Sequence, residues 1–299
     1  TNSQTQNELE RLIHDVIQPL GPALKTMPAA KNDIAFYESF ASQVFARRGT
    51  YGWNGYWLGD AHQVLQWAGL QTDVVFDESI KQSGLDQYKV LVMMDCDVIT
   101  ESILQAIKDF QQRGGIVIAD ERVSPAVKPD IRISSYNRTG KADLDKHELQ
   151  KKAEELRQAL TGKYTRAIDS SNPNVIPYIR SSSHADYIFV VNDNREFGDY
   201  VGHHGRVMEN GLPAETTLSV NRKAGHFYDL VQHQQIHTTS SHQQQTANVK
   251  LGPGAGRIYL RTDQPIDQVG VQVPDSLKRG ETGTVSIKVT DEQGQPVAA

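Results

Sequence analysis

Carboxylate side chains follow several short apolar runs in the first half of the chain. Those at or within a few residues of the end of such a run are Glu38, Asp95, Asp97, Asp120 and Glu121. Two carboxylates roughly 5 to 10 Å apart can serve as the acid and the base of glycoside hydrolysis. Asp also caps helices in strand-to-helix loops, so the same residues suit a structural role. We interpret the five as a candidate polar crevice.

Alternating strand and helix patterns would bring these carboxylates to one edge of a sheet. The apolar runs lie at residues 34–37, 72–76, 89–94 and 116–119. Helical spacing separates them, as in the stripe formed by Trp57, Ala61, Val64, Leu65 and Ala68. Gly69, directly after that stripe, suits a helix C-cap. The alternation predicts an α/β fold with a doubly wound parallel sheet, whose ligand crevice lies beyond the carboxyl ends of the strands.

Aromatic residues cluster with glycines between the first strand and its helix. Tyr51, Trp53 and Tyr56 alternate with Gly49, Gly52 and Gly55. Exposed aromatic rings can stack on sugar faces, so the three aromatic residues form a candidate saccharide platform. Aromatic side chains are also enriched at protein interfaces, and the neighbouring Trp57 suits the core.

Histidines are frequent in the second half of the chain. They are His203, His204, His226, His233, His237 and His242. Their spacing matches no standard zinc site, and no Cys or acidic residue alternates with them. We therefore expect surface histidines, no metal site and no cofactor.

Composition narrows the classes of partner. The 299 residues are 38% hydrophobic and 22% charged, which is ordinary for a globular protein of about two domains. The net charge of -5 and the lack of clustered Lys and Arg argue against nucleic acid. No apolar run approaches the roughly 18 residues of a membrane span. The mixed-sign segment from Lys146 to Arg157 predicts a solvated helix face.

The pattern of predicted secondary structure changes twice along the chain. Residues 1–162 form the alternating α/β region, preceded by an amphipathic helix near residues 8–17. Residues 163–262 contain short strands separated by Asn, Gly and Ser turns, the pattern of an antiparallel β-sandwich. Residues 263–299 hold only two alternating strands, at 269–273 and 285–289. Two strands cannot close a sandwich, so we expect the chain to be a fragment of a longer protein.

Several short sequence segments resemble those of a known domain arrangement. They are Leu20-Gly21-Pro22, residues 85–92, residues 113–118, residues 187–192, Phe227-Tyr228-Asp229-Leu230, residues 251–254 and residues 257–260. The first three resemble the glutamine-amidotransferase-like, flavodoxin-type domain that follows the catalytic barrel in many β-galactosidase-like glycoside hydrolases, often called the trimerisation domain. The rest are similar to the β-sandwich that comes next, and residues 263–299 resemble the start of an immunoglobulin-like module. The resemblance implies a flavodoxin-like sheet followed by a β-sandwich and a partial immunoglobulin-like segment.

The same resemblance implies where a glutaminase nucleophile would lie. Such an elbow needs Cys or Ser between small residues directly after a strand. The chain has Ala119-Asp120-Glu121-Arg122 there. The single cysteine, Cys96, follows another strand between Asp95 and Asp97, whose charges would raise its pKa. We therefore expect no catalytic residue and a structural Cys96.

These observations favour a non-catalytic accessory or assembly region of a larger glycoside-hydrolase-like protein. Its expected partners are further copies of the chain or a missing catalytic domain, with carbohydrate as an additional ligand and neither nucleic acid nor membrane. A hydrolase that uses the carboxylate crevice and a carbohydrate-binding module are the alternatives. The immunoglobulin-like segment favours an extracytoplasmic location, periplasmic or secreted.

Overall fold

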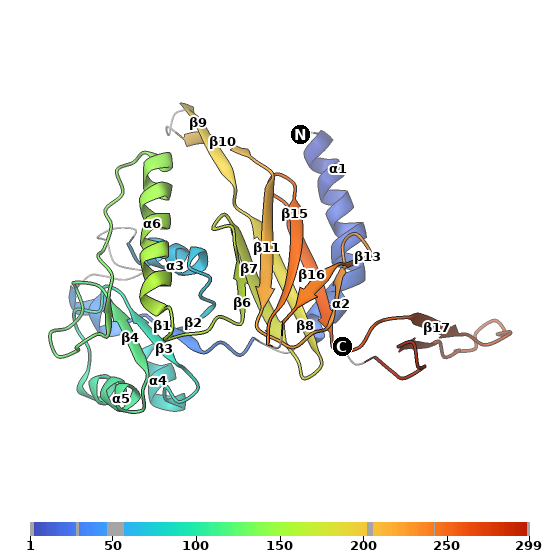
Figure 1. The fold of residues 1–299 in the computed structure, drawn as a ribbon, viewed down its shortest axis with the longest axis horizontal. Coiled ribbons are helices and arrows are strands. Elements are labelled where there is room, and N and C mark those ends of the chain that lie inside the picture. Colours follow the sequence, from blue (N-terminus) through green and yellow to red (C-terminus); the bar gives the residue numbers. More distant parts are fainter. Residues whose placement is uncertain (1–2, 28–29, 47–56, 202–205, 242, 298–299) are drawn as a thin grey trace.

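The computed structural model describes residues 3–27, 30–46, 57–201, 206–241 and 243–297. An α/β domain lies beside a β-sandwich, a helical N-terminal segment runs along the sandwich, and a C-terminal hairpin projects away from both (Figure 1). Within the described ranges, no helix has both the length and the apolar composition needed to cross a membrane.

The α/β domain is built on five parallel strands. They are β1 (Ile34–Tyr37), β2 (Thr72–Val75), β3 (Val90–Met93), β4 (Ile116–Ala119) and β5 (Ile131–Arg132). Their order in the sheet is β2-β1-β3-β4-β5. This is the flavodoxin-like order, in which the chain reverses direction across the sheet between β1 and β3.

Helices cover both faces of this sheet. Helices α3 (Trp57–Trp67) and α6 (Ala142–Leu160) pack on one face, and α4 (Asp77–Ser83) and α5 (Glu101–Gln112) pack on the other. Successive side chains of β1 alternate between the two cores: Ile34 and Phe36 enter the first, and Ala35 and Tyr37 the second. Strands buried on both faces must be apolar throughout, which explains the continuous apolar runs in the sequence.

Besides the solvated face expected over residues 146–157, helix α6 has a buried apolar face. Its side chains at Leu149, Ala153, Leu156 and Leu160 are buried against the sheet and α3. They recur every three or four residues, so one stripe is apolar although the rest of the helix is charged. Even Lys146 is only 9% exposed. Most of the charged residues of this helix lie on its outer, solvent-facing side.

The β-sandwich consists of two antiparallel sheets. One contains β14 (Thr238–Ser240), β15 (Gln245–Leu251), β11 (Ala214–Val220) and β6 (Ile168–Ser170), in that order. The other contains β13 (Gln234–Ile236), β12 (His226–Asp229), β16 (Gly256–Thr262), β8 (Ala185–Asn192) and β7 (Val175–Ser181). Alternate residues of β11 and β15 are buried between the sheets, as expected for strands with one face in a core. The predicted fold class, a parallel α/β sheet followed by an antiparallel sandwich, is confirmed.

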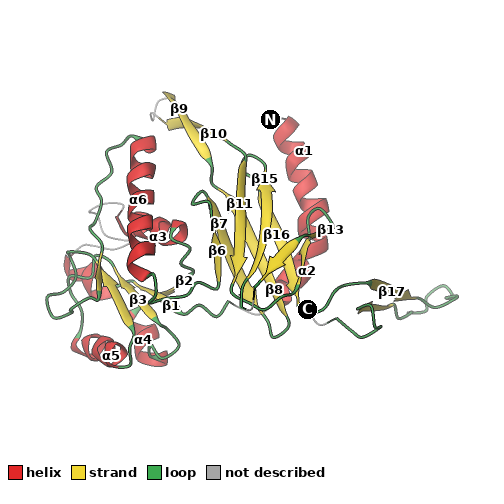
Figure 2. Ribbon diagram, viewed as in Figure 1, coloured by secondary structure: helices red, strands yellow, loops and turns green. Residues whose placement is uncertain are grey.

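Two hairpins extend from the sandwich. Strands β9 (Arg195–Val201) and β10 (Arg206–Gly211) form one that reaches toward the N-terminal end of α6 (Figure 2). Strands β17 (Gln268–Gln272) and β18 (Ser286–Thr290) form the other, at the C-terminal end. Val271 and Ile287 pair across the latter hairpin and are 57% and 67% exposed. This apolar face therefore has no cover within the described chain.

The N-terminal segment is helical from Ser3 to Thr26. Helix α1 (Ser3–Arg11), the π-helical turn Leu12–Ile17 and α2 (Gln18–Thr26) follow one another without a break. The segment lies along the outer face of β8 and β16, where Leu12 and Val16 line a cavity together with Phe189 and Ile258. Other apolar side chains of the segment are exposed, Leu9 by 54% and Ile17 by 59%. The domain boundaries at residues 162 and 262 stay predictions.

Candidate functional site

Asp120 lies directly after β4, at the position where the resemblance implies a nucleophile, and its side chain is 0% exposed. One carboxylate oxygen accepts hydrogen bonds from Trp57 Nε1 at 2.8 Å and from the Asp95 backbone N–H at 2.9 Å. The other accepts the Arg122 backbone N–H at 2.9 Å. Both oxygens are thus held by donors of the protein itself, and the side chain is enclosed.

Burial also shifts the pKa of this carboxyl group. It raises the pKa of Asp120 because a carboxylate loses its hydration, although the three hydrogen bonds oppose this effect in part. The neighbouring Asp95 adds negative charge and is itself paired with Arg122, whose Nη1 lies 2.9 Å from the Asp95 carboxylate. Asp95 has a φ of 54°, a left-handed conformation that is uncommon for a residue with a side chain. The ends of β3 and β4 are thereby tied together.

Cys96 lies inside the core on the α4–α5 face of the sheet. Its thiol donates to the backbone carbonyl of Met94, with Sγ 3.3 Å from the oxygen. Burial raises its pKa, and the negative charge of Asp120 raises it further. Asp95 and Asp97 act in the same direction. A neutral, enclosed thiol of this kind does not act as a nucleophile at neutral pH.

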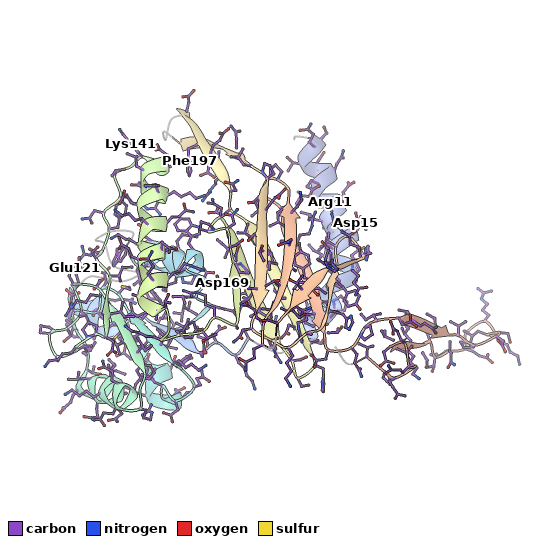
Figure 3. The ribbon with its side chains drawn as sticks, in the orientation of Figure 1. Arg11, Asp15, Glu121, Lys141, Asp169 and Phe197 are labelled. Atoms are coloured by element: carbon purple, nitrogen blue, oxygen red, sulfur yellow. The ribbon has the colours of Figure 1, made fainter. Side chains whose placement is uncertain are left out.

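The remaining crevice residues are held separately at the same edge. Buried Glu38 accepts a hydrogen bond from Gln43 Nε2 at 2.8 Å. Exposed Glu121 accepts from the backbone N–H of Ser135 at 2.9 Å and from its hydroxyl. Figure 3 shows Glu121 on the side of the α/β domain that faces away from the sandwich. The structure therefore gathers Asp95, Asp97 and Asp120 around Cys96 and leaves the two glutamates outside this group.

The candidate saccharide platform of Tyr51, Trp53 and Tyr56 lies outside the described residues and stays a prediction. The adjacent Trp57 packs in the core and donates to Asp120. Of the histidines, His226 is half-buried, and His233 and His237 are exposed on the sandwich. In the part of the chain that the structure describes, no three His, Cys, Asp or Glu side chains are gathered as a metal site would need.

A second region, which sequence reasoning missed, lies between the two domains. A cleft of about 550 Å³ is bounded by α3, by α6 with the loop before it, and by the β9–β10 hairpin. We call it the interdomain cleft. On the α3 wall, Asp60 is almost fully buried and accepts a two-pronged contact from the Arg138 guanidinium, with Nε 3.0 Å from each oxygen. On the α6 wall, burial lowers the pKa of Lys146, and its partner Asp193 opposes that effect.

Asp193 joins the three walls of the interdomain cleft. It accepts a hydrogen bond from Trp67 Nε1 at 3.2 Å, and its carboxylate lies 3.4 Å from Lys146 Nζ. Arg195 approaches the other carboxylate oxygen at 3.2 Å and also pairs with Glu209 at 2.6 Å. These contacts connect α3 and α6 of the first domain with the hairpin of the second.

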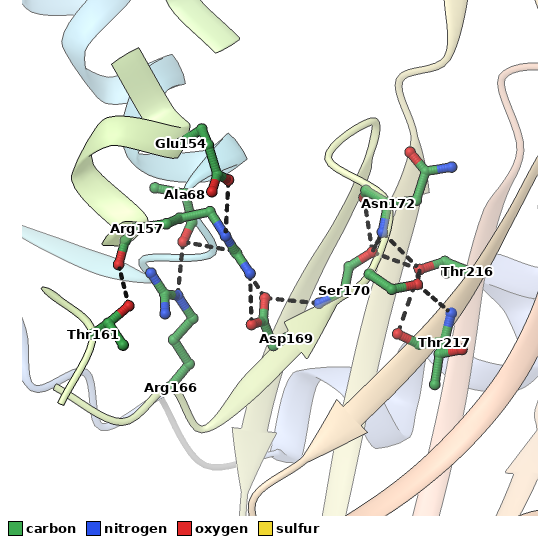
Figure 4. Close-up of polar contacts among 11 residues, drawn as sticks. Ala68, Glu154, Arg157, Thr161, Arg166, Asp169, Ser170, Asn172, Thr216 and Thr217 are labelled. Carbon is green, nitrogen blue, oxygen red and sulfur yellow. Dashed lines mark hydrogen bonds and ion pairs between the residues drawn. The ribbon is translucent and has the colours of Figure 1, made fainter. Parts of the chain in front are cut away.

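A further set of contacts fixes the two domains near the base of α6. Arg157 forms a two-pronged pair with Asp169, with nitrogen-to-oxygen distances of 2.9 and 2.7 Å (Figure 4). Arg157 and Arg166 both donate to the carbonyl of Ala68, at 3.1 and 2.8 Å. Gln71 adds a two-way amide pairing with the backbone of Ile179, at 2.8 and 2.9 Å. These contacts join the two domains at one end of the interdomain cleft.

Comparison with known proteins gives a fold likeness. No protein-family model and no curated protein sequence matches the chain. Among solved structures, α-L-fucosidase isoenzyme 2 from Paenibacillus thiaminolyticus is similar with a TM-score of 0.60 and 11% identity, over 83% of this chain and 51% of the fucosidase. A β-galactosidase from Bacillus circulans sp. alkalophilus is similar with a TM-score of 0.50 and 12% identity, over 82% of this chain and 43% of that enzyme.

A β-galactosidase from Rahnella sp. R3 is also similar, with a TM-score of 0.50 and 11% identity, over 78% of this chain and 41% of that enzyme. The chain therefore spans about half the length of the fucosidase and less than half of the two β-galactosidases. At these identities the likeness concerns the fold alone. The arrangement of a parallel α/β sheet followed by a sandwich is one that occurs in glycoside hydrolases.

Proposed function

We propose that this chain is a non-catalytic accessory and assembly region of a larger glycoside-hydrolase-like protein. The observation that carries the proposal is the burial and hydrogen bonding of the Asp120 side chain. At the position of the expected nucleophile, a fully buried carboxylate accepts hydrogen bonds from Trp57, Asp95 and Arg122. Such a group holds two strand ends together and has no free oxygen for a substrate. The fold likeness to a fucosidase and to β-galactosidases supports the class of the parent protein.

Assembly is supported by apolar surface at both ends of the chain. Leu9, Ile13 and Ile17 are exposed on the N-terminal helical segment, and Val271 and Ile287 are exposed on the β17–β18 hairpin. Burying a side chain of this size contributes on the order of 1.5 to 3 kcal/mol. Contact with another copy of the chain or with a catalytic domain would remove this surface from water.

The catalytic half of the proposal is tested by activity measurements on the purified chain. We expect no turnover of p-nitrophenyl β-galactoside, p-nitrophenyl α-fucoside or glutamine. We also expect no labelling of Cys96 by a glutamine analogue that alkylates active-site cysteines. Turnover that disappears in both Asp95→Asn and Asp120→Asn would instead support the hydrolase alternative.

The assembly half is tested by sedimentation velocity over a range of concentrations. We expect concentration-dependent association that is weakened by the double variant Ile13→Ser/Ile17→Ser. Leu144→Ser is the matched control, because Leu144 is an exposed leucine on α6, away from the N-terminal segment. A chain that stays monomeric at all concentrations, or that associates equally well in all three forms, argues against an assembly role for this segment.

A further inference from the structure

We infer that the interdomain cleft binds a neutral saccharide unit. This inference deepens the proposed function and rests on it for the class of ligand. The volume of about 550 Å³ lies within the usual range for small-molecule sites. Its walls come from both domains, so a bound sugar would contact α3, α6 and the β9–β10 hairpin together.

The aromatic side chains of the cleft suit the apolar faces of a sugar ring. Phe197 from β9 and Trp67 from α3 both contribute to the lining, but Trp67 is only 5% exposed, so Phe197 supplies the accessible ring. Figure 3 shows Phe197 between the hairpin and the N-terminal end of α6. The Arg195 guanidinium carbon lies 5.6 Å from the centre of the Phe197 ring, a distance typical of a cation–π contact. Phe197 is half-buried, so part of its ring remains available to a ligand.

The charges of the lining favour a neutral ligand. The acidic members are Asp60, Asp145 and Glu209, and the basic members are Arg138, Lys146 and Arg195. Each basic side chain is paired with a carboxylate: Arg138 with Asp60, Lys146 with Asp193, and Arg195 with Asp193 and Glu209. With Asp193 counted, four carboxylates face three cations, and every cation is paired, so the cleft offers no net attraction to a phosphate or a sulfate. Paired charges still present acceptors beside donors, and a sugar hydroxyl can donate and accept at once.

The pairing also fixes the lining before any ligand binds. Asp60 and Asp193 are held by partners from separate elements, so their side chains need little further ordering. Pre-ordered polar groups reduce the entropic cost of binding. A second cavity of about 640 Å³, between residues 31–33 and 177–183, lacks this combination. The aromatic residue in its lining, Tyr164, has its hydroxyl bonded to Asp33 at 2.6 Å.

The inference is tested by titrating the whole chain with D-galactose, L-fucose and lactose. Isothermal titration calorimetry and tryptophan fluorescence measure the binding. D-galacturonate and inorganic sulfate serve as charged probes. We expect saturable binding of at least one neutral sugar, and a loss of affinity of about 5- to 150-fold in Phe197→Ala, on the scale known for aromatic stacking. Phe189→Ala is the matched control, since Phe189 is a half-buried phenylalanine on β8 beneath the N-terminal segment.

Glu209→Gln supplies a second variant in case Phe197→Ala disturbs the hairpin. It removes one of the two carboxylates that pair with Arg195, and with it an acceptor for sugar hydroxyls, so we expect weaker binding of the neutral sugar. The inference is overturned if no neutral sugar gives a saturable signal, if only the charged probes bind to the unaltered chain, or if neither variant changes the affinity. These outcomes leave the proposed function standing, because association and lack of turnover are measured separately.

Discussion

The carboxyl edge of the parallel sheet and the interdomain cleft contain the same types of side-chain contact, but they differ in how far these contacts are buried. In each, a tryptophan of α3 donates its indole N–H to an aspartate: Trp57 to Asp120 at the edge, and Trp67 to Asp193 in the cleft. In each, an arginine pairs with a nearby carboxylate. At the edge these contacts enclose the aspartate completely, whereas in the cleft they line an open space.

A cluster of charged residues can bind a ligand only where its pairing leaves a face open. Two carboxylates show the difference in their ionisation. Burial dominates at Asp120 and raises its pKa. At Asp145, burial acts in the same direction, but hydrogen bonds from Thr139 and Tyr136 outweigh it and lower the pKa. The pKa shifts of these two buried carboxyl groups therefore have opposite directions.

The largest expected effect is that of Asp120→Ala. It leaves the Trp57 indole N–H and the backbone N–H groups of Asp95 and Arg122 without their acceptor in a buried place. We expect the free energy of unfolding to fall by about 3 to 5 kcal/mol, because each buried unpaired donor costs about 1 to 3 kcal/mol. Urea denaturation measures this value. Asp120→Asn, which keeps an acceptor oxygen, should cost less, and equal losses in the two variants would contradict the structural role.

Asp193→Ala is expected to have the next largest effect. It removes the carboxylate partner of Trp67, Lys146 and Arg195 and leaves the Lys146 ammonium in a largely buried place. We expect a loss of about 2 to 4 kcal/mol, and calorimetry should show the two domains unfolding in separate transitions. The double variant Lys146→Met/Asp193→Ala should recover part of the loss, because no buried charge remains. A single unchanged transition in Asp193→Ala would show that Asp193 does not couple the domains.

The pH dependence of stability should differ in sign between the two regions. A raised pKa in the folded state means that Asp120 favours the fold when protonated, so its contribution is lost as pH rises from about 3.8 through the raised value. A lowered pKa means that Asp145 favours the fold when ionised, so its contribution is lost as pH falls below about 3.8. Urea denaturation of the unaltered chain, Asp120→Asn and Asp145→Asn, from about pH 3 to pH 7, separates the two. Parallel curves for the variants would refute this contrast.

The smallest effect on stability is expected from deletion of residues 268–299. The deletion keeps Ile266, whose backbone N–H bonds the Tyr228 hydroxyl at 2.7 Å. Because the side chains of β17 are exposed, we expect the free energy of unfolding of the remaining chain to change by less than about 1 kcal/mol. Self-association should weaken, as sedimentation can measure. If the α/β domain loses its cooperative transition, the hairpin packs on the body of the protein.

Elements with two buried faces could be predicted from the amino-acid sequence. Strands β1 and β3 are apolar throughout because each lies between two layers of helices. Gly69, read as a helix C-cap, has a φ of 68°, which glycine adopts without strain. The short strands of the sandwich were also visible, since alternation records one buried face. Residues 195–211 were missed as a hairpin, because charged residues and glycines there carry no apolar alternation.

The contacts of the carboxylates, in contrast, depend on how distant elements pack together. Asp120 is bonded by Trp57, 63 residues away, and Asp193 by Trp67, 126 residues away. No local pattern records such pairs, because hydrogen-bond partners between elements need no fixed spacing in sequence. The same holds for the position of the N-terminal segment on the sandwich and for the cleft beneath the β9–β10 hairpin. Residue type and spacing specify strands and helices, whereas the packing of whole elements specifies which charged side chains meet and which remain open to a ligand.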